Sequence, residues 1–264
     1  MAIRVQDILD QLIEPIGRLD VTVDTLKSGD PSAEVKGIAT TFMATHHVIQ
    51  KAIDLGVNLL ITHEGTFYHH HDQIELLLND PIYLAKQKLI EESGIAIFRF
   101  HDYWHRYRPD GIMTGLIQAL DWSSYVTENR PAASLLTVPA MTVKELAEYV
   151  KSKLGISFVR AAGDLNAQCT RIGLLAGYRG GGRMAIPLFQ NDDVDVILAG
   201  EGPEWETPEY VRDALHQGRK RAFIALGHAE SEEPGMKYLA EMLTSKYPDL
   251  PVHFIPEKQV FQSI

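Results

Sequence analysis

The sequence predicts an α/β fold in which helices cover both faces of a largely parallel β-sheet. Short apolar runs recur along the chain, and amphipathic segments that end in glycine precede several of them. Continuous apolar strands are typical of sheets that are buried on both faces, and their alternation with helices indicates parallel pairing. The 264 residues suffice for one large domain or for two lobes.

Two helix–strand pairs carry this pattern in the first half of the chain. Residues 46–55 place their apolar side chains on one stripe and predict a helix, and residues 57–62 follow as a strand. Pro81 is a favourable first helical residue, and the helix that it opens is predicted to end at Gly94. Residues 95–100 form the next predicted strand.

The second half repeats the pattern. Thr142 and Glu145 have the spacing of a capping box, which predicts a helix over about 143–153. The pattern breaks at 129–131, so we expect two α/β lobes, 1–128 and 129–264. The remaining predicted elements are strands at 172–176, 194–199, 222–226 and 252–255, a helix from Pro208 to Gly218, and a last helix that opens at Pro234.

Composition excludes several classes of protein. The chain carries 25 basic and 35 acidic residues, a net charge of −10, which argues against nucleic-acid binding because such proteins usually present a basic face. The single cysteine, Cys169, excludes an intramolecular disulfide and is expected to be inert. The N-terminus lacks the features of a signal peptide, and no apolar stretch is long enough to span a bilayer. We therefore expect a cytoplasmic protein that neither enters a membrane nor binds nucleic acid.

Three predicted strands are followed directly by residues that bind metals. In open α/β sheets, ligands bind beyond the carboxyl ends of the strands, so parallel strands would bring these residues to one edge. A lone histidine after a strand is more often a loop or capping residue, but three such strand ends favour a metal site. Four imidazoles and two carboxylates suit a pair of zinc, manganese, iron or cobalt ions. The candidate ligands are His63 and Glu64, His101 and His105, and His228 and Glu232.

Other candidates are weaker. The histidines at 69–71 lie in a polar loop and are expected to be solvated or at a rim, and those at 46–47 are expected to be exposed. The glycine-rich segment 177–183 follows a strand, where backbone N–H groups can cradle an anion. It matches neither the P-loop nor the dinucleotide fingerprint, so a tight turn is the preferred interpretation. Glu201 also ends a strand and is expected near the same edge.

Three segments of the sequence resemble the NIF-three-like family, which is also labelled GTP cyclohydrolase I type 2. That family has a His-His pair after an early strand, a later H-x-x-x-D, and a late G-H with glutamate four residues on. The corresponding segments here are Leu60-Ile61-Thr62-His63-Glu64-Gly65, Phe100-His101-Asp102-Tyr103-Trp104-His105 and Gly227-His228-Ala229-Glu230-Ser231-Glu232. They occur in the family's order and span nearly the whole chain.

Two positions depart from the family pattern. Glu64 stands where the family has its second histidine, and His105 stands where it has the aspartate. Together the departures exchange an imidazole for a carboxylate and back, which preserves the set of four histidines and two carboxylates. Alternatively, Asp102 replaces the lost aspartate as a ligand and His105 supports the site from behind. A carboxylate bridges two ions readily and a neutral imidazole does not, so the bridging ligand is left open.

The resemblance implies a short-form, two-lobed, three-layer α/β/α protein, with largely parallel or mixed sheets and a dinuclear metal site between the lobes. It also implies a ring-shaped homohexamer. The leading hypothesis is a metal-dependent hydrolase acting on a cyclic amide, nucleotide-like or phosphoester substrate. Glu64 would complete or bridge the site, and Glu230 or Glu201 would act as general base. The alternatives are a non-catalytic metal-binding assembly or regulatory protein, and a nucleotide-binding module that uses residues 177–183.

Overall fold

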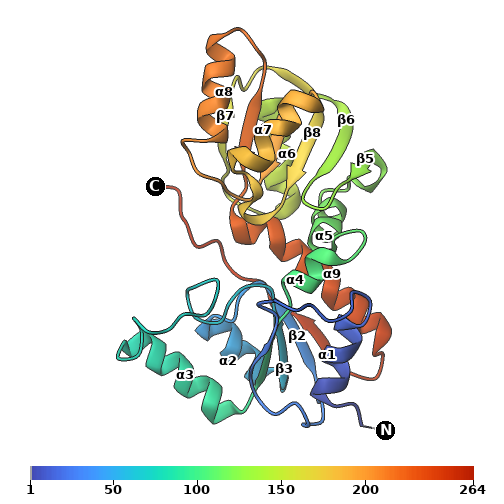
Figure 1. The fold of residues 1–264 in the computed structure, drawn as a ribbon, viewed down its shortest axis with the longest axis vertical. Helices are drawn as coiled ribbons and strands as arrows, with labels where there is room; N and C mark the ends of the chain where they lie inside the picture. The colour runs from blue at the N-terminus through green and yellow to red at the C-terminus, as the bar shows by residue number, and fades with distance from the viewer. Residues whose placement is uncertain (1) are drawn as a thin grey trace. The chain divides into compact units, whose positions relative to one another are not determined.

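The computed structural model describes residues 2–264 and divides the chain into two compact units. Unit 1 contains the residues up to Gly111 together with Met236–Lys258, and unit 2 contains Ile112–Gly235 and Gln259–Ile264. The division therefore falls near residue 111, whereas the sequence pattern placed it at 128. Residues Met236–Lys258 belong to unit 1 because the last strand of the chain pairs with an early one, and so completes the first sheet (Figure 1).

Unit 1 is built on a five-stranded sheet with the order β1-β4-β3-β2-β11. Only β1 runs antiparallel to its neighbour, and the other four strands are parallel to one another. The central three are entirely buried, which agrees with the mostly apolar sequences of β3 and β4. The strands are β1 (Leu26–Ser28), β2 (Ile38–Thr41), β3 (Leu59–Thr62), β4 (Ala96–Arg99) and β11 (Val252–Phe254).

Helices cover both faces of this sheet, with α2 and α3 on one side and α1 on the other (Figure 1). The predicted boundaries of α3 are confirmed: Asp80 caps its first N–H groups, and Gly94 ends it in the left-handed conformation at φ +63°. A buried cluster joins α2 and α3 to the sheet through side chains such as Val48, Leu60 and Ile90. The helices are α1 (Val5–Ile13), α2 (His46–Asp54), α3 (Pro81–Ser93) and α4 (Asp102–Arg106).

Unit 2 is built on a six-stranded mixed sheet with the order β5-β6-β8-β9-β10-β7. The strands β8, β9 and β10 are parallel, and the other pairings are antiparallel. The parallel centre was predicted by its apolar runs, and the antiparallel additions are shorter or partly exposed. The strands are β5 (Val126–Asn129), β6 (Ser134–Thr142), β7 (Arg160–Gly163), β8 (Gln168–Leu175), β9 (Val196–Ala199) and β10 (Ala222–Ala225).

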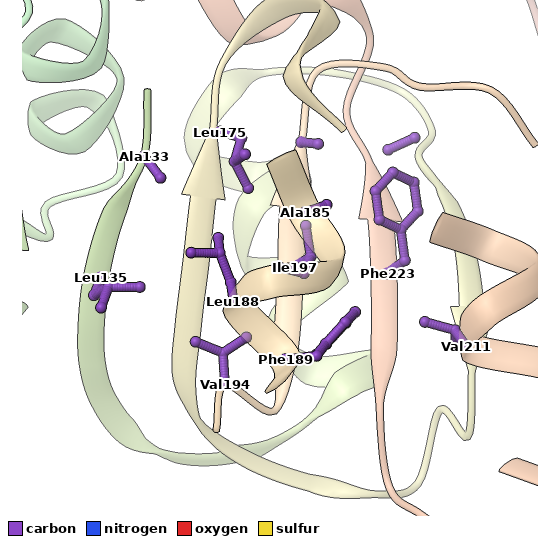
Figure 2. Close-up of a cluster of buried hydrophobic side chains, with 12 residues drawn as sticks. Ala133, Leu135, Leu175, Ala185, Leu188, Phe189, Val194, Ile197, Val211 and Phe223 are labelled. Atoms are coloured by element: carbon purple, nitrogen blue, oxygen red, sulfur yellow. The ribbon is translucent and has the colours of Figure 1, made fainter. Parts of the chain in front are cut away.

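The apolar core of unit 2 lies where α7 packs on the parallel strands (Figure 2). Leu188 and Phe189 of α7 face Ile197 and Phe223 of the sheet in this cluster, and all four side chains are buried. None of the helices within residues 2–264 is long and apolar enough to cross a bilayer. The helical segments are α5 (Gly111–Ala119), η1 (Ser123–Tyr125), α6 (Val143–Leu154), η2 (Gly177–Arg179), α7 (Gly182–Asn191), α8 (Thr207–His216) and α9 (His228–Lys246).

The predicted start of the last helix at Pro234 is wrong. Helix α9 begins at His228 and contains the proline. Helical bonding begins earlier because Gly227, at φ +112°, turns the chain out of β10, and the Ser231 N–H already donates to the Gly227 carbonyl oxygen at 3.1 Å. A proline inside a helix removes one backbone donor, which weakens a helix locally and does not require it to begin there.

The expectation that three ligand-bearing strands share one sheet edge is also wrong. Strands β3 and β4 are parallel neighbours in the sheet of unit 1, whereas β10 belongs to the sheet of unit 2. The sequence pattern indicates strands and their direction but carries no information on which strands share a sheet. His63 and His101 therefore belong to one sheet edge, and His228 to another.

Lys86 of α3 is buried, with only 1% of its surface exposed. Its ammonium group donates to the carbonyl oxygen of Thr66 and lies 5.3 Å and 5.1 Å from the ring centroids of Phe67 and Tyr68. Burial lowers the pKa of Lys86 to about 8, against the partial opposition of the Glu257 and Asp72 charges. The lysine thus ties α3 to the loop after β3 at an electrostatic cost near neutral pH.

This cost predicts a pH-dependent contribution to stability. The pKa of Lys86 falls from 10.5 in the unfolded chain to about 8 in the folded one, so the charged lysine destabilises the folded state. The free energy of unfolding is therefore highest above pH 10.5, where the lysine is neutral in both states, and decreases as the pH falls to 8. Relative to Lys86→Met, the wild type should gain about 3 kcal/mol of unfolding free energy between pH 7.5 and pH 10.5. Urea denaturation at both pH values measures this difference. Lys88→Met, on the exposed face of the same helix, is the control, and an equal pH response in both variants would contradict the prediction.

Candidate metal centre

The carboxyl ends of β3 and β4 place two histidines at one edge of the unit 1 sheet. The two strands pair in parallel, with Thr62 opposite Arg99. His63 follows β3 directly, and His101 follows β4 after one residue. The chain then turns into the short helix α4, which carries His105 one helical turn beyond His101.

These three histidines form a compact group. Each imidazole offers a ligand nitrogen, and the three nitrogens all lie within 4.8 Å of one another. The ring centroids of His63 and His101 are 4.6 Å apart, and that of His105 lies 4.9 Å from each. His63 is fully buried, and the other two side chains are 18% and 11% exposed. Three convergent imidazoles are a ligand set that binds zinc and similar divalent ions.

The Nδ1 atom of each imidazole is held by an oxygen. His63 Nδ1 lies 3.3 Å from the carbonyl oxygen of Phe100, His101 Nδ1 lies 3.0 Å from Asp102, and His105 Nδ1 lies 2.9 Å from Asp110. These contacts fix the ring orientations and assign Nε2 as the nitrogen that would bind a metal. Histidines that bind metals characteristically donate their other N–H to a carboxylate or carbonyl in this way.

The electrostatics of His101 favour its neutral form, which is the form that binds a metal. Burial lowers the pKa of His101 to about 4, assisted by the neighbouring His63 and His105 and opposed by the hydrogen bond to Asp102. The same hydrogen bond is the main cause that holds the pKa of Asp102 below its usual range. The imidazole is therefore neutral and the aspartate ionised throughout the physiological pH range.

Asp102 supports His101 from behind. One carboxylate oxygen receives the imidazole N–H, and the other accepts hydrogen bonds from the Thr22 hydroxyl at 2.9 Å and the Val23 N–H at 3.1 Å. Of the two alternatives left open by the sequence, the geometry groups His105 with the other imidazoles and places Asp102 behind His101.

Glu64 belongs to a second group that overlaps the first. Its carboxylate and the imidazoles of His70 and His101 bring their donor atoms within 4.8 Å of one another. Oε2 of Glu64 also lies 2.7 Å from Nη2 of the fully buried Arg99, which is not a member of this group. Oε1 lies 3.7 Å from Nε2 of His101. The carboxylate thus meets both a guanidinium and a histidine of the first group.

His228 and Glu232 are brought together in unit 2. They lie one turn apart at the start of α9, with Nε2 of His228 3.1 Å from Oε2 of the buried Glu232. His228 Nδ1 donates to Oε1 of Glu201 at 2.7 Å, and this hydrogen bond is the main cause that lowers the pKa of Glu201. The arrangement repeats that of unit 1, in which an oxygen orients each candidate histidine through Nδ1.

Close backbone packing surrounds this pair. The Gly177 N–H donates to the Ser231 hydroxyl at 2.8 Å, and the same hydroxyl donates to the His228 carbonyl oxygen. A Cβ atom on Gly177 would lie 2.0 Å from Oε1 of Glu232, and one on Gly200 would lie 2.4 Å from Oγ of Ser231. Glycine is required at both positions so that the loops after β8 and β9 can approach the start of α9.

The remaining predicted residues lie elsewhere. The Glu230 carboxylate lies over Gly227 in the first turn of α9. His69 and His71 are exposed, as are the histidines at 46–47. Cys169 is buried, and burial raises the pKa of its thiol to about 11, which agrees with an inert role.

The glycine-rich segment forms the short helix η2 and the turn into α7, as predicted. At the start of α7 the Gly182 N–H donates to the carboxylate of Glu206 at 2.6 Å. The chain's own glutamate therefore occupies the helix N-terminus that the nucleotide-binding alternative would use for a phosphate.

Several residues of the site were not predicted. Arg99 is the last residue of β4 and reads as a strand terminus, and His70 reads as part of an exposed histidine tract. Asp110 lies five residues beyond His105 with a loop between them, so the sequence does not reveal that its carboxylate contacts the His105 ring. Asp24, which accepts hydrogen bonds from the N–H groups of His101 and Tyr103, is distant in sequence. Only Asp102 gave a usable signal, since an aspartate directly after a candidate ligand can reach its ring.

Comparison with known proteins gives one consistent result. The model of the Duf34/NIF3 (NGG1p interacting factor 3) family matches residues 3–260. A GTP cyclohydrolase 1 type 2 homolog of Clostridium perfringens is 24% identical over 242 residues, which cover 89% of this chain and 87% of the relative. The homolog of Clostridium acetobutylicum is 26% identical over 256 residues, covering 92% and 90%. The crystal structure of a Bacillus cereus protein related to NIF3 superposes with a TM-score of 0.78 at 14% identity, covering 100% of this chain and 99% of the other.

Proposed function

Because this chain belongs to the Duf34/NIF3 family, we propose that it is a divalent-metal-dependent hydrolase. The proposed ligands in unit 1 are the imidazoles of His63, His101 and His105. Those in unit 2 are His228 and Glu232. Two donor groups of this kind are the basis for proposing two divalent ions per chain.

The orientation of the histidines is the observation that carries the proposal. Four imidazoles each have Nδ1 within 3.3 Å of an oxygen, and in three of the four that oxygen belongs to a carboxylate. Histidines that serve only as buried packing residues need a satisfied hydrogen bond, but they do not need to gather their ring nitrogens within 4.8 Å of one another, as His63, His101 and His105 do. The donor set of neutral nitrogen and carboxylate oxygen, without thiolate, suits zinc, manganese, iron or cobalt.

The chemistry follows from this donor set. A divalent ion held by imidazoles supplies Lewis-acid activation of water and of a carbonyl or phosphoryl oxygen. The carboxylates of Asp102, Asp110 and Glu201 keep the imidazoles in the orientation and tautomer that metal binding through Nε2 requires. Since Glu201 already holds His228, we assign the role of general base to Glu230 rather than to Glu201.

The substrate class is proposed from the names of the relatives. Curated relatives over about nine-tenths of the chain are called GTP cyclohydrolase 1 type 2 homologs. Opening of a nucleotide's purine ring is hydrolysis of a cyclic amidine or amide, which is within the reach of metal-assisted attack by water. Cyclic amides, nucleotides and phosphoesters are therefore the substrates to test.

The test begins with metal content. Protein purified without a histidine tag and without chelators is analysed by plasma mass spectrometry, together with His105→Ala and with His47→Ala as an exposed control. We expect bound divalent ions in the wild type and in the control, and the loss of about one ion per chain in His105→Ala. Absence of metal after incubation with zinc, manganese, iron or cobalt would contradict the proposal.

Hydrolysis is tested on the same samples. Activity towards the three substrate classes should disappear on chelation and return on readdition of the ion. Glu230→Gln should keep its metal and lose turnover. Bound metal without turnover of any of these substrates would favour a metal-binding assembly or regulatory protein over the hydrolase.

A further inference from the structure

We infer that Arg99 is a positioning residue of the unit 1 metal centre, which holds one oxygen of Glu64 and so presents the other oxygen to the ion that His101 binds. The inference rests on the proposed function, since it concerns a further ligand of the same ion. It deepens that function by naming the residue that fixes a carboxylate beside the three imidazoles.

The two oxygens of the Glu64 carboxylate face different partners. Oε2 accepts hydrogen bonds from Nη2 of Arg99 at 2.7 Å and from the Gly65 N–H at 3.2 Å. Oε1 lies 3.7 Å from Nε2 of His101. The arginine therefore engages one oxygen, and the other is turned towards a proposed metal ligand.

The approach of Oε1 to His101 is that of two electron-pair donors. Nδ1 of His101 donates to Asp102 at 3.0 Å, so Nε2 of the neutral ring carries a lone pair. A separation of 3.7 Å is also too long for a hydrogen bond between the two atoms. In a tetrahedral site with bonds of about 2.1 Å, ligand atoms lie roughly 3.4 Å apart. A cation between Oε1 and Nε2 therefore fits this arrangement.

The two donor groups of unit 1 meet at His101, which belongs to both of them. A neutral imidazole has a single lone pair on its unprotonated nitrogen, so His101 binds one ion. A carboxylate that binds together with His101 must therefore act on the ion that the three imidazoles hold. Glu64 would add an anionic oxygen to neutral nitrogens, a combination that suits zinc, manganese, iron and cobalt.

The position of Arg99 suits it to hold this carboxylate. Its side chain is fully buried at the end of β4, two residues before His101. Nε donates to the His63 carbonyl oxygen at 3.2 Å, and Nη1 donates to the His70 carbonyl oxygen. One planar guanidinium thus fixes both the backbone of His63 and the carboxylate of Glu64.

The charges also agree with this role. Arginine keeps its proton in proteins, so the guanidinium is a permanent cation. The carboxylate meets the guanidinium through Oε2 and faces His101 through Oε1, and its negative charge therefore lies between the arginine and the ion. Outer partners of this kind orient metal ligands, and their loss typically weakens metal binding about 10–100-fold.

The test compares Arg99→Lys, Glu64→Gln and the double variant. Arg99→Lys keeps the charge but loses the planar set of donors, and Glu64→Gln keeps the size of the side chain but loses its charge. Lys27→Gln is the control, because Lys27 holds the same loop through Asp72 at 2.7 Å. All proteins carry His228→Ala, which removes a proposed ligand of unit 2, so that the titration follows the unit 1 ion.

Three measurements are made on the metal-free proteins. Titration with Co²⁺ gives the Kd and the visible d–d absorption, whose strength falls as the coordination number rises. Infrared difference spectra on Co²⁺ binding report whether a carboxylate binds through one oxygen, since this widens the separation of its two stretching bands. Circular dichroism and thermal melting establish that each variant is folded.

Arg99→Lys should bind Co²⁺ about 10–100-fold more weakly than the His228→Ala parent. Its d–d absorption should be lower, because a carboxylate that is no longer held can bind through both oxygens. Glu64→Gln should bind at least about tenfold more weakly and should lack the infrared change of the parent. Adding Arg99→Lys to Glu64→Gln should alter the Kd by less than about threefold, because no carboxylate remains to be positioned. Lys27→Gln should stay within about threefold of the parent.

Two results would overturn the inference and leave the proposed function standing. One is a folded Arg99→Lys with the parent's Kd, or with the same loss of affinity whether residue 64 is glutamate or glutamine. The other is an infrared change that is absent from the parent or unaffected by Glu64→Gln, and this result does not depend on the folding of an Arg99 variant. A parent that binds no ion contradicts the proposed function, and the inference fails with it.

Discussion

Gly177→Ala is expected to remove the metal-binding capacity of the His228 and Glu232 pair and to destabilise the protein by about 3 kcal/mol or more. The new Cβ would lie 2.0 Å from Oε1 of Glu232 and 3.2 Å from Nε2 of His228. The carboxylate cannot retreat freely because Glu232 is buried. Overpacking of a buried site and a left-handed φ of +62° each cost on the order of 1–3 kcal/mol.

A matched glycine separates these two causes. Gly155 ends α6 at φ +67°, and a Cβ there would meet nothing within 4 Å. Gly155→Ala should therefore report the conformational cost alone, about 1 kcal/mol, with the metal content unchanged. Urea denaturation and metal analysis of both variants provide the comparison. Equal destabilisation, or full metal content in Gly177→Ala, would show that the close approach to Glu232 is not needed.

Asp24→Ala is expected to destabilise the protein by roughly 3–5 kcal/mol and to weaken metal binding by the unit 1 histidines about 10–100-fold. The Asp24 carboxylate is buried and accepts the N–H of His101 at 2.8 Å and that of Tyr103 at 2.9 Å. These bonds hold the turn from β4 into α4. Without the carboxylate both N–H groups lose a charged acceptor. The backbone of His101, which positions its imidazole, is then no longer held in place.

An exposed aspartate with similar bonding serves as the control. Asp30 accepts two hydrogen bonds from Ser32, at 2.8 Å from the N–H and 2.7 Å from the hydroxyl, but lies at the surface. Asp30→Ala should change stability only slightly and should leave metal affinity intact, since water replaces the lost acceptor. Stability is measured by urea denaturation and affinity by Co²⁺ titration. A comparable loss in both variants would mean that the burial of Asp24 is unimportant.

The strand ends and helix caps of this protein could be predicted because they depend on neighbours in sequence. The apolar run of β3 followed by His63, the proline and glycine that bound α3, and the Thr142 and Glu145 capping box are all local signals. The two-lobed α/β class and the family follow from the same signals and from their order. Helix capping and turn formation depend on interactions between residues that are close in sequence, so a short window of sequence is enough to predict them.

The failed predictions concern relations between distant segments. The start of α9 was misplaced because a proline signal outweighed the turn at Gly227, whose φ of +112° only the fold reveals. The assignment of β10 to the same sheet as β3 and β4 failed because strand direction does not determine sheet membership. Both errors come from treating a local preference as if the rest of the chain had no influence.

By itself, the sequence determined which residue types follow each strand and therefore the candidate donors, His63, His101, His105 and His228. Only the tertiary structure decided how these donors are used. It placed Asp102 behind His101 and paired Glu64 with Arg99, a residue 35 positions further along the chain. Ligand orientation depends on burial and on charges brought from other strands, and those interactions exist only once the chain has folded.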